Sequence, residues 1–250
     1  MQFPYDRWNI PEQCLLDKRI YKKLFHENTK LTATDKKWFT TDIDSLIWQY
    51  TIKPELTLIS EFQQENYAYN EIAVLDVDVN DFNHSERLAD IIQRTIPHPL
   101  LIVFRYEERI ALSIADKRYN LNDPQAATLQ DLWTTEFILP DSLSDVQEQF
   151  LNQLDYQKQP KLHLKAFYQR WIDAFIAYES AKITGRYEID KSLREEETRR
   201  STLQQYHEIE GQVNDLKSRI KKEQSFSKQV ELNQEIKQLQ SQLTEIAEQL

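Results

Sequence analysis

Glycine is almost absent from this chain: only two occur among its 250 residues, Gly185 and Gly211. Loops that cradle phosphate groups need several closely spaced glycines, because glycine lets backbone N–H groups approach the ligand. The nucleophile elbow of hydrolases is also built on paired glycines. The sequence therefore excludes a P-loop, a dinucleotide-binding fingerprint and a nucleophile elbow, and it disfavours a nucleotide-driven enzyme.

Cysteine, metal-binding patterns and long apolar runs are also missing. The single cysteine, Cys14, permits neither an intramolecular disulfide nor a thiolate metal cluster, and the five histidines form no local zinc pattern. The N-terminus lacks the basic-then-apolar layout of a signal peptide, and no apolar run approaches the ~20 residues of a membrane span. We therefore expect a cytoplasmic protein with no cofactor and no contact with a membrane.

The charge is divided unevenly along the chain. Residues 161–250 hold 15 basic and 15 acidic residues, so the whole net charge of −10 lies on residues 1–160. An acidic surface repels phosphate backbones, whereas Lys and Arg contacts supply most of the affinity of nucleic-acid binders. We expect no direct nucleic-acid binding by this acidic body.

The strongest positive pattern is a pair of apolar heptad runs in the last fifty residues. The first run consists of Tyr206, Ile209, Val213, Leu216 and Ile220. The second consists of Leu232, Ile236, Leu239, Leu243, Ile246 and Leu250. Both have the 3–4 spacing of a coiled-coil seam, but their frames are two residues out of step across the polar stretch 221–228.

Two structures are compatible with this phase break. A helical hairpin that turns within 221–228 needs no defect in either helix, and its arms cover each other within one chain. A continuous helix would need a second chain to cover its seam, which would make the protein an obligate dimer. We favour the hairpin over residues 195–250, and therefore a monomer before any complex forms. The partner-binding residues predicted on this segment are Leu203, Tyr206, Phe226, Val230, Leu232 and Ile236.

The rest of the chain reads as a small α+β domain with one mostly antiparallel sheet and packed helices. The predicted elements are a helix over 33–50 with Thr34 as N-cap, a strand-like segment over 56–69, strands over 71–79, 100–106, 110–115 and 128–139, and a helix over 85–95. A short helix capped by Asp141 or Ser142 follows, and then a helix with an aromatic stripe from Leu164 to Tyr178. We assign 1–160 to the acidic domain, 161–194 to a connecting helix and charged neck, and 195–250 to the hairpin.

One group of residues offers an alternative, catalytic interpretation. Asp76 and Asp78 occupy alternate positions of the 71–79 strand, so they share a face on which two carboxylates could ligate Mg²⁺. A restriction-type nuclease would also need an acidic residue followed two positions later by Lys. Asp116 and Lys117 are adjacent instead, and a one-residue shift turns the Lys to the opposite face.

The simpler interpretation of the aspartates is a solvent-facing strand edge, with Ala73, Leu75 and Val77 packed beneath it. We therefore assign no catalytic residue and no metal ligand. Asp76, Asp78, Asp116 and Lys117 are kept only as the alternative nuclease site.

Six segments of the chain together carry a family resemblance. They are Asp17-Lys-Arg-Ile-Tyr-Lys-Lys, Ser45-Leu-Ile-Trp-Gln-Tyr-Thr-Ile-Lys-Pro-Glu-Leu-Thr-Leu-Ile, Glu71-Ile-Ala-Val-Leu-Asp-Val, Asp90-Ile-Ile-Gln-Arg-Thr-Ile-Pro-His-Pro-Leu-Leu-Ile-Val-Phe, Asp131-Leu-Trp-Thr-Thr-Glu-Phe and Glu223-Gln-Ser-Phe-Ser-Lys-Gln-Val-Glu-Leu-Asn. Taken together they resemble an uncharacterised bacterial family, domain of unknown function 4391.

The resemblance implies a context rather than a chemistry. It implies a companion of DNA methyltransferases and helicase-nuclease proteins in restriction-modification-like phage-defence loci. It carries over no catalytic residue. We therefore expect a non-catalytic accessory subunit that docks onto a larger helicase, nuclease or DNA methyltransferase. The alternatives are a metal-dependent nuclease and a regulator whose acidic body mimics DNA in the groove of a DNA-processing partner.

Overall fold

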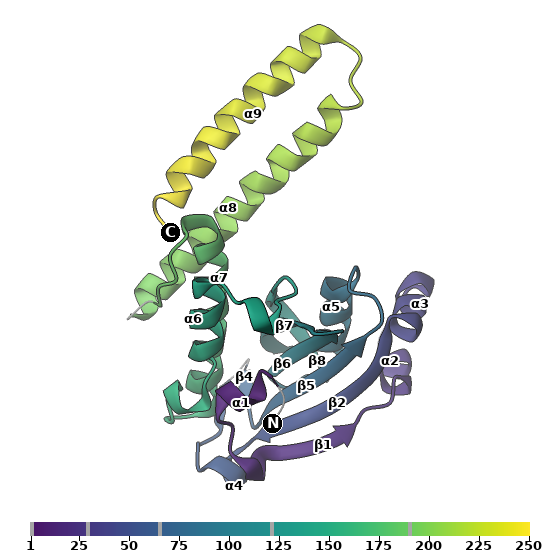
Figure 1. Cartoon of the computed structure of the whole chain (residues 1–250), viewed down its shortest axis with the longest axis vertical. Helices are drawn as coiled ribbons and strands as arrows, with labels where there is room; N and C mark the ends of the chain where they lie inside the picture. The colour runs from purple at the N-terminus through teal and green to yellow at the C-terminus, as the bar shows by residue number, and fades with distance from the viewer. Residues whose placement is uncertain (1–2, 29–30, 65–66, 121–122, 190–191) are drawn as a thin grey trace. The chain divides into compact units, whose positions relative to one another are not determined.

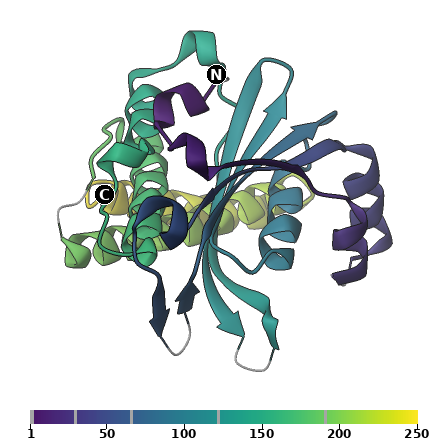
Figure 2. The ribbon, with the colours of Figure 1, turned by 90° about the horizontal axis from the view of Figure 1, so that it is seen from below.

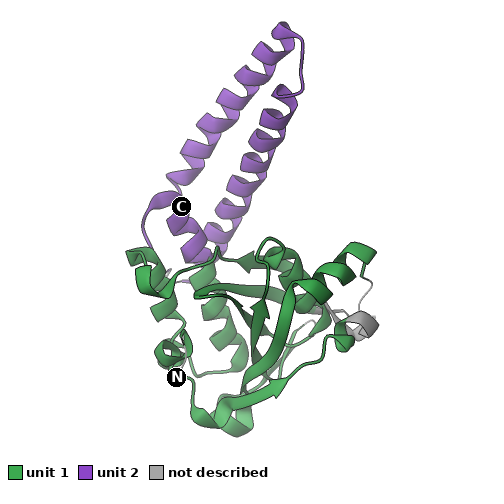
Figure 3. Cartoon of the chain, turned by 45° about the vertical axis from the view of Figure 1, so that its right-hand side comes forward, with its two compact units in different colours: residues 1–175 green, residues 176–250 purple. Residues whose placement is uncertain are grey.

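The computed structural model describes residues 3–28, 31–64, 67–120, 123–189 and 192–250, without the side chains of 26–28, 119–120, 123–127 and 193. The chain divides into two compact units, residues 1–175 and 176–250 (Figure 3). The boundary falls inside one long helix. The two units are described in turn.

The first unit is built on a six-stranded sheet whose order is β1-β2-β5-β6-β7-β8 (Figure 1). Its strands are β1 Leu15–Arg19, β2 Ile43–Ile52, β5 Ile72–Val79, β6 Leu100–Tyr106, β7 Arg109–Asn120 and β8 Asp123–Thr134. β5 and β6 are parallel and are joined through helix α5, Ser85–Thr95. The other neighbouring pairs are antiparallel, which confirms a mixed fold with a mostly antiparallel sheet.

Short helices and one long helix surround the sheet. They are α1 Tyr5–Trp8, α2 Lys23–Asn28, α3 Ala33–Thr41, α4 Pro54–Thr57, α6 Asp145–Gln153 and α7 Leu164–Thr184, with 3₁₀ helices at Glu12–Cys14, Pro140–Ser142 and Tyr156–Lys158. A separate two-stranded sheet pairs β3, Phe62–Gln64, with β4, Tyr67–Tyr69.

Helices lie on both sides of the sheet (Figure 2). On one side, Leu88 and Ile92 of α5 belong to the same buried core as Leu75 of β5 and Phe104 of β6. On the other side, the Tyr168 hydroxyl of α7 accepts a hydrogen bond from the Leu100 N–H and donates one to the Ala115 carbonyl. Both faces of the central strands are therefore largely covered, and these strands read as nearly continuous apolar runs.

The predicted helix over 33–50 is wrong in its second half. Helix α3 ends at Thr41, and Ile43 begins β2, which pairs with β1 on one side and β5 on the other. Ile43, Leu46 and Tyr50 are buried at a spacing that also fits one face of a helix, so periodicity did not separate the two structures. Pairing on both sides satisfies the backbone N–H and C=O groups of β2, and this favours a strand over a helix.

Other element boundaries differ in smaller ways. The N-cap of α3 is Thr32, which forms a capping box with Asp35, and the cap of α6 is Ser144. The predicted strand over 56–69 is replaced by α4 and the β3–β4 pair, and β8 begins and ends five residues before the predicted 128–139. β1 was not predicted, because five residues that include Asp17, Lys18 and Arg19 carry little strand signal.

The second unit contains two long helices, α8 Leu193–Ile220 and α9 Phe226–Ala247. They lie side by side and are joined by residues 221–225 (Figures 1 and 3). The side chains packed between them all come from the two heptad runs: Val213, Leu216 and Ile236 are buried, with Ile220, Leu232, Leu239 and Leu243 packed against them. None of the helices in the described part of the chain has both the length and the apolar character needed to cross a bilayer.

Candidate functional site

Asp76 lies in the middle of the sheet rather than at a solvent-facing edge. β5 is paired on both sides, and Asp76 is buried on the face opposite α5. Arg105 of β6 holds it: Nε donates to Oδ1 at 2.6 Å, and Nη2 donates to Oδ2 at 3.3 Å. The prediction of an exposed carboxylate is therefore wrong, because the neighbouring strands and the N-terminal segment cover it.

The N-terminal segment completes this buried pair. Arg105 Nη1 donates to the Phe3 carbonyl at 2.8 Å, and the guanidinium lies 5.4 Å from the centre of the Tyr5 ring. Burial raises the pKa of Asp76, and the nearby Arg105 guanidinium acts in the opposite direction. Both carboxylate oxygens accept from Arg105, so the geometry is that of a structural ion pair.

Asp78 and Asp116 occupy different surroundings. Asp78 Oδ2 accepts a hydrogen bond from Ser45 Oγ at 2.6 Å, at a hollow of about 440 Å³ that Asp44 and Arg109 also line. In the sheet register, Asp76 lies opposite Val103, and Val103 lies opposite Leu112. Asp116 lies four positions beyond Leu112 on β7, which at ~3.3 Å per residue is ~13 Å from Leu112 along the strand.

Lys117 points to the other side of the sheet. Its Nζ donates to the Ile96 carbonyl at 2.8 Å and to the His98 carbonyl at 2.9 Å. Burial lowers the pKa of Lys117 well below its usual value. The alternative nuclease residues therefore do not converge: Asp76 and Asp78 share a face, Asp116 lies away from them, and Lys117 faces the α5 layer. Among the described residues, no group of three or more His, Cys, Asp or Glu side chains is placed to hold a metal ion.

The residues predicted to bind a partner fall into two groups. Leu203 is 3% exposed and Ile236 is buried, while Leu232 packs against the apolar cluster between α8 and α9. Leu203, although predicted to bind a partner, therefore exposes little surface. Phe226 and Val230 are 79% and 40% exposed, one helical turn apart at the start of α9. Tyr206 is partly exposed on α8.

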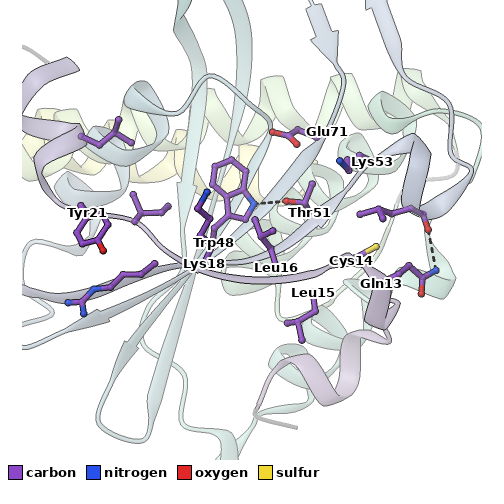
Figure 4. A pocket seen from close by; sticks show the side chains of 14 residues that line it. Gln13, Cys14, Leu15, Leu16, Lys18, Tyr21, Trp48, Thr51, Lys53 and Glu71 are labelled. Carbon is purple, nitrogen blue, oxygen red and sulfur yellow. Dashed lines mark hydrogen bonds between the residues drawn. The ribbon is translucent and has the colours of Figure 1, made fainter.

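Sequence reasoning missed a second surface, an apolar groove of about 710 Å³ beside the edge strand β1 (Figure 4). Its walls come from β1, β2 and the segments that flank them. The lining residues are Gln13, Cys14, Leu15, Leu16, Lys18, Arg19, Ile20, Tyr21, Leu24, Trp48, Thr51, Lys53, Leu56 and Glu71. Their only sequence signal is the apolar pair at 15–16 next to a basic cluster, which is too short to indicate a strand.

The comparisons with known proteins bear on the family alone. No curated protein and no solved structure matches the chain. One family model, described as a domain of unknown function (DUF4391), matches residues 8–243. The match covers both the sheet unit and most of the α8–α9 unit, so the resemblance seen in the six segments is confirmed. The chain belongs to the DUF4391 family.

Proposed function

We propose that this chain is a non-catalytic accessory subunit of a restriction-modification-like anti-phage defence complex. In this proposal α8 and α9 form a coiled-coil hairpin within one chain. The end of the hairpin at residues 221–230 docks onto a larger helicase, nuclease or DNA methyltransferase. The partner class follows from what the family resemblance implies.

The observation that carries the proposal is the contrast between the seam and the tip of α8 and α9. The seam residues pack against one another, so they need no second chain to cover them. Phe226 and Val230 lie outside the seam and are exposed. Exposed aromatic side chains are characteristic anchors of protein interfaces. At ~1.5 Å per residue, α8 and α9 are ~42 and ~33 Å long, and the exposed pair lies at the end of α9 that adjoins the turn.

The turn before Phe226 is held by local hydrogen bonds. Glu223 Oε1 accepts from the Gln224 and Ser225 N–H groups, both at 2.9 Å, and the Gln229 side chain donates to the Glu223 carbonyl at 2.7 Å. These bonds fix the first turn of α9. A preformed apolar pair loses less conformational entropy on binding than a flexible one, which favours docking at this turn.

Co-purification tests the proposal. The affinity-tagged full chain is co-expressed with the helicase, nuclease and methyltransferase genes that neighbour its own gene, and the retained proteins are measured. We expect the wild type to retain one of them and the Phe226→Gln/Val230→Gln variant to lose most of it. Glutamine is a good helix former, so α9 stays intact.

The matched control is Leu58→Gln/Leu162→Gln, which removes two exposed apolar side chains outside α8 and α9. This variant is expected to retain the partner as the wild type does. Equal retention by the tip variant and the wild type, or no retained neighbour at all, contradicts the proposal.

A further inference from the structure

The groove beside β1 is a surface feature that the proposed function does not use. It lies on the α5 side of the sheet, where Trp48 sits at the margin of the core and is only partly buried. Leu16, Tyr21 and Leu24 are 47%, 74% and 44% exposed around it. Apolar side chains gathered in one concave place are typical of a binding surface rather than of scattered exposure.

The Trp48 ring forms the middle of the groove and is held in place. Its Nε1 donates to Thr51 Oγ1 at 2.8 Å, so the polar edge of the indole is satisfied and its apolar surface faces the groove. Figure 4 shows Lys18 on one side of the ring, Thr51, Lys53 and Glu71 on the other, and Leu16 below it. An incoming apolar side chain would therefore meet an ordered surface.

The backbone of β1 adds a second recognition element. β1 is the first strand in the sheet order, and β2 is its one strand partner in the described part of the chain. Its outer edge is available for an added strand, the mode by which many domains bind extended peptides. The irregular register between Leu15 and Lys18, with Asp17 at φ 46°, limits the regular edge to a short stretch. Such bulges oppose open-ended sheet growth, so the edge suits a short segment better than a second sheet.

The charge of the groove selects the chemistry of that segment. Lys18, Arg19 and Lys53 line it against a single carboxylate, Glu71. This local excess of positive charge lies on a unit whose 1–160 segment carries the whole net charge of −10. An acidic segment is attracted to the basic residues of the groove, whereas a basic segment is repelled by them and attracted instead to the acidic surface elsewhere on the body.

We propose that this groove binds a short extended segment of a partner protein whose groove-facing residues include both apolar and acidic ones. The segment adds a strand to the outer edge of β1, places apolar side chains against Leu16 and Trp48, and pairs its carboxylates with Lys18 and Lys53. This inference rests on the proposed function only in requiring a protein partner. It concerns a surface separate from the α9 tip residues.

Peptide selection on the purified full chain tests the inference. A display library of random 12-residue peptides is selected against the wild type, and enriched peptides are synthesised with a fluorescein label for anisotropy titrations. We expect enriched peptides that combine apolar residues with Asp or Glu. Lys18→Glu/Lys53→Glu is expected to weaken their binding about tenfold or more, since two favourable ion pairs become repulsive. Leu16→Ser is expected to weaken it as well.

Two matched variants control for charge and for apolar surface. Lys36→Glu/Lys37→Glu makes the same charge change at exposed positions of α3, and Leu162→Ser removes an exposed leucine elsewhere. Both are expected to bind the peptides as the wild type does. Failure to enrich peptides, enrichment of basic peptides, or equal binding by the groove variants overturns the inference. So does a chain dimer in light scattering that Leu16→Ser dissociates, because the occupant would then be a second copy.

The tip variant Phe226→Gln/Val230→Gln separates this inference from the proposed function. It is expected to bind the selected peptides normally, because the groove uses none of its residues. Lost peptide capture by the groove variants alone therefore reports on β1, whereas lost co-purification by the tip variant reports on α9.

Discussion

Asp35 shows how one buried carboxylate connects two helices of the sheet unit. Its oxygens accept from Arg87 Nε and Nη2 of α5, both at 2.8 Å, and Oδ2 accepts from the Thr32 N–H at 3.1 Å. The hydrogen bond from Arg87, assisted by those from Thr32, holds the pKa of Asp35 well below its usual value. The charged form is therefore the one that the folded protein stabilises.

We predict that Asp35→Asn lowers the free energy of unfolding by about 1–3 kcal/mol at pH 7, because it removes charge-assisted hydrogen bonds from a buried site. A depressed pKa contributes stability above the unfolded value of about 3.9, and this contribution falls as the pH drops through the folded pKa. The difference between wild type and variant should therefore shrink between pH 4 and pH 3. Urea unfolding at pH 7, 4 and 3 measures it, with the exposed Asp141→Asn as control. A constant difference across this range would refute the assignment.

Arg105 and Asp76 lead to a second prediction at this scale. Arg105→Met leaves the buried Asp76 without its partner, so we expect a loss of about 3–5 kcal/mol. The double variant Asp76→Asn/Arg105→Met should lose less than the sum of the two single variants, because no uncompensated charge remains. A double-mutant cycle by urea unfolding checks this coupling. Additive losses would show that the pair does not act as a structural unit.

The surroundings of Asp76 are beyond the reach of sequence analysis. The strand and the shared face of Asp76 and Asp78 follow from alternation in the sequence. Arg105, which pairs with Asp76, and Phe3, which accepts a hydrogen bond from Arg105, are distant from Asp76 in the sequence and are brought there by the sheet order and the N-terminal segment. When the sheet order is not known, an aspartate at a solvent-facing edge and an aspartate in a buried ion pair have the same local sequence pattern.

At the scale of elements, the strength of the local pattern decided what could be predicted. Helix α5 and strands β5 and β6 were placed correctly, because each has a single periodicity and clear ends at Pro97, Pro99 and the Glu107-Glu108 turn. β2 was taken for a helix because its apolar residues suit both periods. β1 was missed because it gains its structure from pairing with β2 rather than from apolar residues of its own.

The helices α8 and α9 give a prediction about connectivity. Leu216 and Ile236 are buried in the same cluster, so cysteines at these positions in a Cys14→Ala background should join within one chain. A short bis-maleimide reagent followed by denaturing electrophoresis measures this. We expect a band of altered mobility at the mass of one chain, at every protein concentration. A cross-linked species at twice that mass, favoured by concentration, would instead indicate a continuous helix paired between two chains.

For the whole molecule, the distribution of charge and apolar surface matters more for partner binding than any single side chain does. Because segment 1–160 is acidic, mimicry of DNA in the partner's groove stays a prediction. Competition between the chain and duplex DNA for the partner would test it, and the competition should weaken as the salt concentration rises. Sequence analysis placed the two C-terminal helical runs but not the β1 groove, because a groove is formed by residues from several distant segments. The family match spans residues 8–243, and the function proposed for the chain depends on its exposed surfaces.

Amide hydrogen exchange on the co-purified complex tests the central claim most directly. The exchange of each peptide is compared between the free chain and the chain bound to its retained partner. We predict that protection on binding is greatest over residues 221–232, which include the turn and the exposed pair Phe226 and Val230. A stable complex whose formation leaves exchange in this segment unchanged would contradict docking through the end of α8 and α9.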